Sequence, residues 1–175
     1  AGEGKALLPS VDGYENYVDH VCRFVHNDKA KELYYNHVRT IVNRVNTVTG
    51  KRYKDDPAIF SWQIGNEPRA FARDSLTKAA FHDWMTASAA LIKSLDSNHM
   101  VSSGSEGLYG CEVDMDLFEK IHSDSNFDYM NIHIWPLVWR WVDKDTFADS
   151  VHVAVAKTEK YMTAHFPVAE RIGKP

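Results

Sequence analysis

Three short polar segments contain most of the residues that could do chemistry, and each follows an apolar run. They are residues 65–69 (Gly-Asn-Glu-Pro-Arg), 104–107 (Gly-Ser-Glu-Gly) and 133–136 (His-Ile-Trp-Pro). Glu67 is the sharpest candidate, because a carboxyl group that emerges from a hydrophobic strand is partly desolvated, which raises its pKa. A carboxyl group that keeps its proton near neutral pH can protonate a leaving oxygen. The alternative is a structural glutamate that caps the next helix or pairs with Arg69.

The elements that would position these segments alternate between helix and strand. Helical periodicity and capping residues predict four helices, whereas apolar and β-branched runs predict three strands. The helices cover residues 28–49, 75–95, 114–121 and 145–165, and the strands cover 58–64, 100–103 and 127–134. This alternation is typical of βαβ units and a parallel sheet, in which the carboxyl ends of the strands lie at one edge. The three polar segments are therefore expected to meet at that edge.

The first two helices have recognisable ends and apolar faces. Asp28 and Ser75 are predicted N-caps, and Gly50 is a residue type that ends helices. The 3.6-residue periodicity places Leu33 of the first helix and Leu76 of the second on the faces that point inward.

Composition excludes several classes of protein. The chain has 175 residues, of which 44% are hydrophobic and 25% charged, values typical of one globular domain. With a net charge of -4, the chain does not have the excess of basic residues that is typical of nucleic-acid-binding proteins. No apolar run approaches the ~20 residues that span a bilayer. We therefore expect neither a nucleic acid nor a membrane as partner.

Cysteines and histidines do not predict a metal site. Cys22 and Cys111 allow one disulfide at most, and the sequence leaves their pairing open. The chain has no Cys-x-x-Cys, no His-x-x-x-His and no Cys/His cluster, so a structural zinc site is not expected.

Several segments together resemble one enzyme family. Residues 62–69 resemble the Asn-Glu-Pro motif on strand four of glycoside hydrolase family 5, a group of retaining (β/α)₈-barrel enzymes. Residues 43–57 resemble the run into that motif in the endo-β-1,4-mannanase branch. Residues 104–107 and 131–136 are similar to its strands five and six. The resemblance covers nearly the whole chain, with the motifs in the family's order and spacing.

The resemblance implies an α/β fold that is a portion of a (β/α)₈ TIM barrel, about strands four to six with their helices. It implies a retaining endo-β-1,4-mannanase that hydrolyses internal bonds of β-mannan or glucomannan and needs no metal or organic cofactor. Since polysaccharides are met outside the cytoplasm, an extracellular or periplasmic location is expected.

Site roles follow from the same resemblance. Glu67 matches the family's general acid/base, and Asn66 matches the residue that hydrogen-bonds the sugar 2-hydroxyl. His133 matches the strand-six histidine that lines the cleft. Trp135 stands where the family often has tyrosine, which keeps a stacking face but loses the hydroxyl.

Other residues near the predicted site are expected to support it. Glu106 is a second carboxylate at the edge, but the family carries its nucleophile on strand seven, so Glu106 is expected to act through hydrogen bonds, as is Arg69. Trp139 and Trp141 follow strand six, where tryptophans either stack on sugar rings or cover the barrel rim. Trp139 is the favoured sugar-binding residue of the two.

By this resemblance residues 1–175 are a partial catalytic domain. Residues 13–18 resemble the loop after strand three, and residues 172–175 resemble the approach to strand seven. A retaining enzyme needs two carboxyl groups about 5–5.5 Å apart, so the chain alone is expected to be inactive. Open strand edges would favour self-association.

Two other functions compete with the mannanase. One is a β-1,4-glucanase of the same family, which would use the same acid. The other is a non-catalytic half-barrel that binds carbohydrate through its aromatic cleft.

Overall fold

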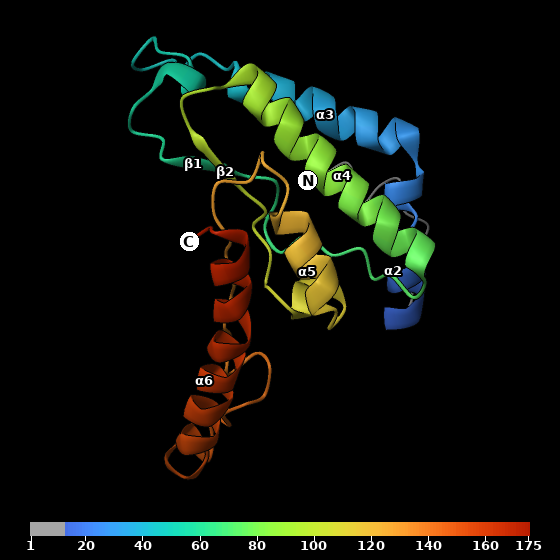
Figure 1. Cartoon of the computed structure of the whole chain (residues 1–175), viewed down its shortest axis with the longest axis vertical. Coiled ribbons are helices and arrows are strands. Elements are labelled where there is room, and N and C mark those ends of the chain that lie inside the picture. The colour runs from blue at the N-terminus through green and yellow to red at the C-terminus, as the bar shows by residue number, and fades with distance from the viewer. Residues whose placement is uncertain (1–12) are drawn as a thin grey trace.

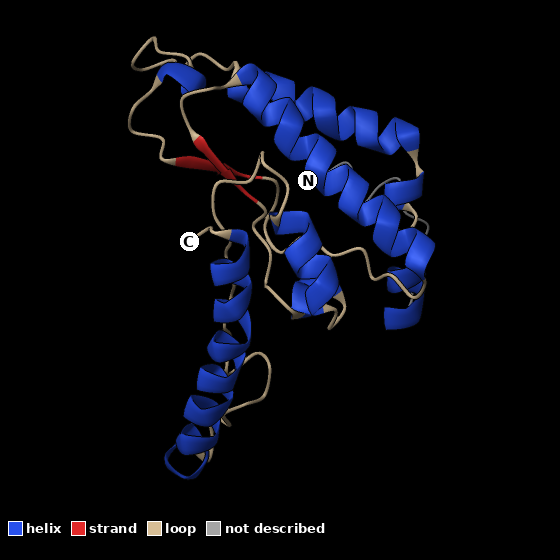
Figure 2. Cartoon of the chain, in the orientation of Figure 1, coloured by secondary structure: helices blue, strands red, loops and turns tan. Residues whose placement is uncertain are grey.

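The computed structural model describes residues 13–175 of the chain. Two short parallel strands form its sheet and lie beside the helices. Strand β1 (Ser61–Gln63) pairs with β2 (Met100–Ser102), and Trp62 lies opposite Val101. Helix α4 (Ser75–Leu95) connects the two strands, as in a βαβ crossover. Figure 2 shows the strand pair next to the long helices. The expected mixed α/β class with a parallel sheet is confirmed.

The remaining named elements are helical. They are α2 (Tyr14–Val21), α3 (Asp28–Val42), α5 (Met115–His122) and α6 (Phe147–Ile172), with 3₁₀ turns η1 (Phe24–His26), η2 (Tyr53–Asp55) and η3 (Tyr109–Cys111). Helices α3 and α4 lie side by side, and α6 extends away from them (Figure 1). Within residues 13–175, none of the helices combines the length and apolarity that crossing a membrane requires. Helix α2 occupies residues 14–21, where the sequence predicted a loop, so that expectation was wrong.

The main apolar core lies where α3, α4 and α5 pack on the strands. Its most deeply buried side chains come from α4, β2 and α5 and include Met85, Val101 and Phe118. The core positions predicted for Leu33 and Leu76 are wrong, because these side chains are 64% and 77% exposed, and Val45, Val155 and Met162, which the same periodicity predicts to point inward, are exposed as well. Each lies at the margin of an apolar stripe, and the neighbouring helix decides which part of a stripe is covered.

Helices α3 and α4 begin at residues 28 and 75, as predicted, but their N-caps lie one residue earlier than the predicted Asp28 and Ser75. Asn27 caps α3 by accepting a hydrogen bond from the backbone N–H of Ala30 at 3.0 Å. Asp74 caps α4 in the same way with Thr77 at 2.7 Å. Both caps are residue types that compete well for the free N–H groups of a first helical turn.

Helix α3 ends at Val42, seven residues before the predicted end at 49. The amide of Asn43 donates to the carbonyl oxygen of Arg39 at 2.9 Å, which satisfies a carbonyl of the last turn. Asn46 then accepts from the backbone N–H of Val48 at 2.8 Å. Side-chain amides that bond to nearby backbone favour turns over helix, which explains the early end.

Helix α6 runs further than predicted, to Ile172 instead of 165. It passes through Pro167, because Val168 and Ile172 in the following turn pack against the main core. It ends at Gly173, whose left-handed φ of 66° is the usual glycine C-cap geometry. The free energy gained by burying the last turn therefore outweighs the loss of the backbone hydrogen bond that the proline cannot donate.

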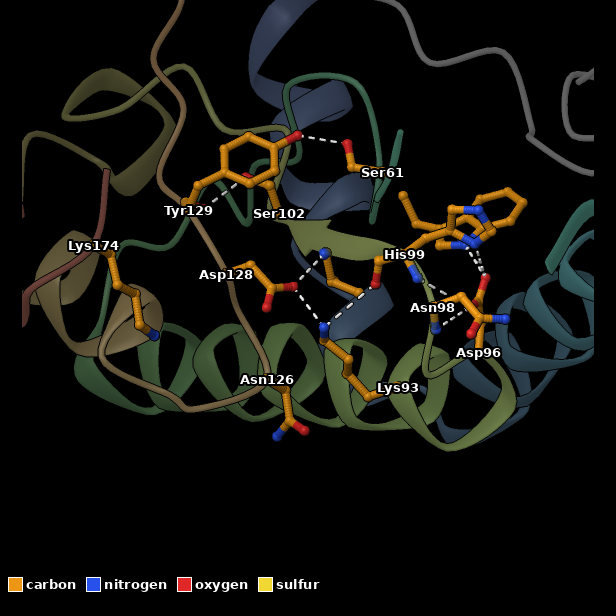
Figure 3. Close-up of polar contacts among 12 residues, drawn as sticks. Ser61, Lys93, Asp96, Asn98, His99, Ser102, Asn126, Asp128, Tyr129 and Lys174 are labelled. Carbon is orange, nitrogen blue, oxygen red and sulfur yellow. Dashed lines mark hydrogen bonds and ion pairs between the residues drawn. The ribbon is translucent and has the colours of Figure 1, made fainter. Parts of the chain in front are cut away.

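Residues 127–134 run beside β2 but do not form the strand that the sequence predicted. Asp128 donates its N–H to the carbonyl oxygen of Val101 at 2.9 Å, and its carboxylate accepts the N–H of the same residue at 2.6 Å. The hydroxyl oxygen of Ser102 lies 3.0 Å from the carbonyl oxygen of Tyr129 and 2.7 Å from Asn131 Oδ1, and its single hydrogen is shared between these two acceptors (Figure 3). Side chains thus take the place of the regular backbone ladder and hold the segment in register.

Two histidines are buried where α5 and α6 meet. His122 donates from Nδ1 to the carbonyl oxygen of Phe118 at 2.8 Å and lies 2.8 Å from the Ser103 hydroxyl through Nε2. His165 donates from Nδ1 to the carbonyl oxygen of Tyr161 at 2.7 Å. Burial lowers the pKa of both rings, that of His122 to about 4. Both histidines are therefore neutral at neutral pH.

This burial predicts that the fold loses stability in mild acid. The unfolded chain binds protons on these histidines below about pH 6.5, whereas folded His122 binds one only near pH 4. The free energy of unfolding should therefore be fully retained above pH 6.5 and fall as the pH approaches 4, with about 3 kcal/mol from His122. Urea unfolding at several pH values between 7 and 4.5 measures this slope.

The matched variants are His122→Asn and His152→Gln, since His152 is exposed on α6. The slope should become shallower in His122→Asn and stay unchanged in His152→Gln. An equal slope in wild type and His122→Asn would contradict the assignment of the acid sensitivity to the buried ring.

Candidate active site

Backbone hydrogen bonds join the segments that follow β1 and β2. The N–H of Ile64 donates to the carbonyl oxygen of Ser102 at 3.2 Å, and that of Glu67 to the carbonyl oxygen of Gly104 at 2.9 Å. Gly104 has a φ of 75°, and a Cβ there would lie 1.8 Å from the carbonyl oxygen of Gly65. Only glycine allows this approach, which brings Glu67 to the carboxyl end of β2.

The carboxylate of Glu67 accepts two hydrogen bonds on one oxygen. His133 Nδ1 lies 2.7 Å and Trp135 Nε1 lies 2.9 Å from Glu67 Oε1. An ionised carboxylate only accepts, so His133 carries its proton on Nδ1 in this contact. The side chain of Glu67 is 30% exposed, and Trp135 is 52% exposed. The segments after β1 and after residue 132 thus converge as the sequence predicted.

The pKa of Glu67 is lowered, which contradicts the raised value expected from the sequence. The hydrogen bond from His133 is the largest cause, and the indole of Trp135 and the charge of Arg69 act in the same direction. Desolvation raises the pKa but does not balance these donors. In this structure Glu67 is an ionised carboxylate at neutral pH.

Asn131 connects the end of β2 to the segment that carries His133. Its side-chain oxygen accepts from the Ser102 hydroxyl at 2.7 Å and from the N–H of Gly104 at 2.9 Å. Its side-chain nitrogen donates to the carbonyl oxygen of Ser105 at 2.8 Å. One amide therefore satisfies a backbone N–H and a backbone carbonyl that a third strand would otherwise pair, and it also accepts from a side-chain hydroxyl. No polar role for this residue was predicted, although it lies two positions before His133.

Glu106 forms an ion pair with Arg69. Arg69 Nε lies 2.5 Å from Glu106 Oε2, and the side chain of Glu106 is only 6% exposed. The carbonyl oxygen of Glu106 also accepts the N–H of His133 at 3.3 Å. Glu106 thus links Arg69 to the backbone of His133, and its supporting role in the site stays a prediction.

Helix α6 holds the loop that carries Glu106. The hydroxyl of Tyr161 donates to the carbonyl oxygen of Glu106 at 2.6 Å, and the N–H of Leu108 donates to His165 Nε2 at 2.9 Å. Gly107 passes between them with a φ of 91°, and a Cβ there would lie 2.6 Å from His165 Nε2. The loop is therefore fixed on both sides of its glycine.

A cleft of about 520 Å³ opens beside Glu67. It brings together most of the predicted site, since Asn66, Glu67, Arg69, Glu106 and Trp139 all line it. Their roles stay predictions. Its other walls are Tyr17, Val21, Phe71 and Val138.

Tyr17 and Phe71 were not predicted as cleft residues. Their rings pack edge to face with centroids 5.7 Å apart, which joins α2 to the segment after Glu67. The signal in the sequence was weak, because Tyr17 lies in the stretch that resembled a loop.

The two tryptophans after residue 136 differ in position. Trp141 is buried and packs on Tyr161, with ring centroids 6.0 Å apart. Trp139 is half-buried, meets Tyr109 edge to face at 4.8 Å and reaches the cleft. Trp141 therefore covers the base of the loop, whereas Trp139 presents aromatic surface to the cleft.

The cysteines are free thiols, Cys22 half-buried and Cys111 buried. Burial raises the pKa of the Cys111 thiol to about 12, so it is not a nucleophile at neutral pH. Within residues 13–175, no three His, Cys, Asp or Glu side chains are grouped so that they could hold a metal ion.

Comparison with known proteins identifies the family. A family model described as "GH family 5 beta-mannosidase-like" matches residues 3–175. The chain belongs to glycoside hydrolase family 5. The resemblance noted in the sequence is therefore confirmed.

Relatives and solved structures agree with this assignment. Mannan endo-1,4-beta-mannosidase 1 of Arabidopsis thaliana is 34% identical over 175 residues, covering 83% of this chain and 42% of that protein. A family 5 mannosidase from Rhizomucor miehei, solved as a mutant with mannosyl-fructose, is 29% identical with a TM-score of 0.79, covering 99% of this chain and 40% of that one. The endo-beta-1,4-mannanase of Thermotoga petrophila is 27% identical with a TM-score of 0.67, covering 88% of this chain and 34% of that one. The chain thus spans less than half the length of these family 5 proteins.

The hydrogen bonds on Glu67 predict how its pKa responds to substitution. Trp135→Phe removes one donor from the carboxylate, so the pKa of Glu67 should rise. Carbon NMR of the Glu67 carboxyl group during a pH titration measures it, with Glu67→Gln to assign the signal.

Trp139→Phe is the matched control, because the hydrogen bonds to Glu67 Oε1 come from His133 and Trp135. The control should leave the pKa of Glu67 unchanged. An unchanged pKa in Trp135→Phe would show that the indole contact is not formed in solution.

Proposed function

We propose that this family 5 chain is the acid/base-bearing portion of a retaining endo-β-1,4-mannanase. The observation that carries the proposal is the Glu67 carboxylate at the end of β1, bound on one oxygen by His133 and Trp135 and open to the cleft. The family match and the names of the relatives support the substrate class.

In this proposal the chain supplies about strands four to six of the barrel. β1 and β2 are strands four and five, and residues 127–134 take the place of strand six beside β2. The match to 40% of the Rhizomucor miehei mannosidase supports this assignment. Further strands of the complete barrel would then cover the open edge of β1.

Glu67 would act through the oxygen that His133 and Trp135 leave unused. With Oε1 held by these donors, Oε2 is the oxygen that would carry the proton to the glycosidic oxygen of a sugar in the cleft. The carboxyl group must first gain a proton, and a bound sugar raises its pKa by excluding water, as does a second carboxylate nearby. Glu67 then protonates the leaving oxygen and later removes a proton from the attacking water.

The second carboxylate of a retaining pair must lie about 5–5.5 Å from the first. Glu106 is the other carboxylate that lines the cleft, but its Oε2 is bound to Arg69. We assign the nucleophile to a further strand of the complete barrel and Glu106 to holding Arg69 and His133 in place. The 175-residue chain alone is then expected to bind manno-oligosaccharides without hydrolysing them.

Asn66 and Trp139 would hold the sugar in the cleft. Asn66 is exposed beside Glu67, where its amide can bond a 2-hydroxyl, and Trp139 offers an aromatic face to pyranose C–H groups. Because such a polymer is met outside the cytoplasm, we propose an extracellular or periplasmic location.

A chimera tests the proposal. Residues 13–175 replace the matching part of the Rhizomucor miehei mannosidase, and hydrolysis of β-1,4-manno-oligosaccharides is followed. In the chimera, Glu67→Gln should lower kcat by about 10²–10⁴-fold, the usual contribution of a general acid/base. Glu170→Gln, on the exposed face of α6, is the control and should leave kcat unchanged.

Retained turnover in Glu67→Gln would refute the assignment of the acid. Turnover of carboxymethylcellulose in place of glucomannan would favour the glucanase. Sugar binding with no turnover in any chimera would favour a non-catalytic carbohydrate-binding half-barrel.

A further inference from the structure

A pocket of about 370 Å³ lies between the loop that contains η3 and the middle of α6. Leu108, Tyr109 and Val113 line it from the loop, and Lys157 and Lys160 line it from the helix. The residues that line it are all different from those that line the Glu67 cleft, so it is a separate site. Its volume falls within the range of about 300–1,000 Å³ that ligand pockets have.

Helix α6 holds the loop side of this pocket in place. The N–H of Leu108 donates to His165 Nε2 at 2.9 Å, and the N–H of Tyr109 donates to the Tyr161 hydroxyl oxygen at 3.3 Å. The rings of Tyr109 and Tyr161 also pack together, with centroids 5.1 Å apart. Because this wall is already ordered, binding of a ligand does not carry the entropic cost of ordering it.

The charge at this pocket is positive, although the whole chain has a net charge of -4. Lys157 and Lys160 are exposed one turn apart on α6, and neither forms an ion pair within residues 13–175. Two like charges one turn apart repel each other, so an anion that contacts both would be stabilised. Acidic residues adjoin both walls in the sequence, but their side chains are engaged elsewhere: Glu159 lines a different hollow, Glu112 binds the backbone of residues 71–72, and Asp114 pairs with Lys78.

The floor of the pocket is aromatic and aliphatic. Tyr109 is half-buried, Val113 is 67% exposed, and Trp141 and Tyr161 contribute the small parts of their rings that reach the surface. Aromatic rings pack edge to face or offset on such surfaces. An inorganic anion has no apolar body to cover them, and a neutral sugar would desolvate two ammonium groups without pairing them. The lining therefore selects a flat apolar ring that carries an anionic group.

We propose that this pocket binds a small aryl carboxylate, with the ring against Tyr109 and Val113 and the carboxylate between Lys157 and Lys160. The site goes beyond the mannanase function, because it requires neither Glu67 nor a sugar. Ion pairs to exposed lysines are weak, so we expect a dissociation constant of about 1 mM for a ligand of this size.

An NMR titration of the 175-residue chain with trans-cinnamate at low ionic strength tests the proposal. The backbone N–H signals of Tyr109 and Val113 and the indole N–H signal of Trp141 should shift together and saturate. Cinnamamide has the same shape without the charge and should bind about five- to tenfold more weakly, because two exposed ion pairs are lost. Added salt should weaken the binding of cinnamate, because it screens exposed charges.

A matched pair of substitutions at Val113 separates the effect of charge from that of shape. Val113 has a φ of 59°, a conformation that Asn and Asp tolerate better than valine does. Val113→Asp places a negative charge on the pocket wall and should abolish the binding of cinnamate. Val113→Asn introduces a side chain of almost the same size without the charge and should retain it.

Substitution of the lysines gives an independent test that leaves the loop intact. The double variant Lys157→Gln with Lys160→Gln should bind cinnamate about as weakly as the wild type binds cinnamamide. Lys120→Gln removes an exposed lysine of α5 that lies outside the pocket, and this control should bind cinnamate as the wild type does. Because all three lysines are exposed, these variants should keep the unfolding midpoint of the wild type.

The possible results lead to distinct conclusions. Equal affinity for cinnamate and cinnamamide, or binding of cinnamate that persists in the double lysine variant, overturns the anion site. Inorganic phosphate that shifts the same signals with equal affinity shows recognition of charge alone and overturns the aryl ligand. An absence of shifts at Tyr109, Val113 and Trp141 overturns the pocket altogether, and the chimera still tests Glu67 separately.

Discussion

The arrangement of the site depends on the hydrogen bonds that the side-chain amide of Asn131 makes. It binds Ser102 and the backbone of Gly104 and Ser105, while the carbonyl oxygen of Gly104 accepts the N–H of Glu67. Through these bonds the ends of three chain segments are held in one register without a regular third strand. A buried backbone group that loses its partner is costly, so an amide that serves several of them stabilises the whole edge.

The electrostatics of Glu67 follow from this arrangement. The register of the segment that carries His133 and Trp135 places both side chains against Glu67 Oε1. These two donors stabilise the charged form of the carboxylate. The proposed role as a general acid needs the opposite balance, which a bound sugar and a second carboxylate would provide. The hydrogen bonds orient the carboxylate, and the protonation state depends on what else fills the cleft.

Helix α6 supports the site from outside the sheet. Tyr161 and His165 bind the backbone of the loop that carries Glu106, and the ring of Tyr161 packs on Trp141. The same helix therefore shapes both the Arg69–Glu106 pair and the pocket that contains Lys157 and Lys160. Since His165 accepts a backbone N–H through Nε2, this support requires a neutral imidazole.

The sequence by itself determined the helix–strand alternation, the family and the convergence of Glu67, His133 and Trp135, because apolar periodicity and local motifs carry that information. It predicted the end of α4 but not those of α3 and α6, since Asn43 stops α3 early and burial of Val168 carries α6 past Pro167. Tertiary structure alone decided that residues 127–134 bind β2 through side chains, that the pKa of Glu67 falls, and that the carboxylate of Glu112 is buried against the backbone of Phe71 and Ala72. These outcomes depend on atoms brought together from distant parts of the chain, and the balance of donors, burial and charge at one atom exists only once the chain has folded.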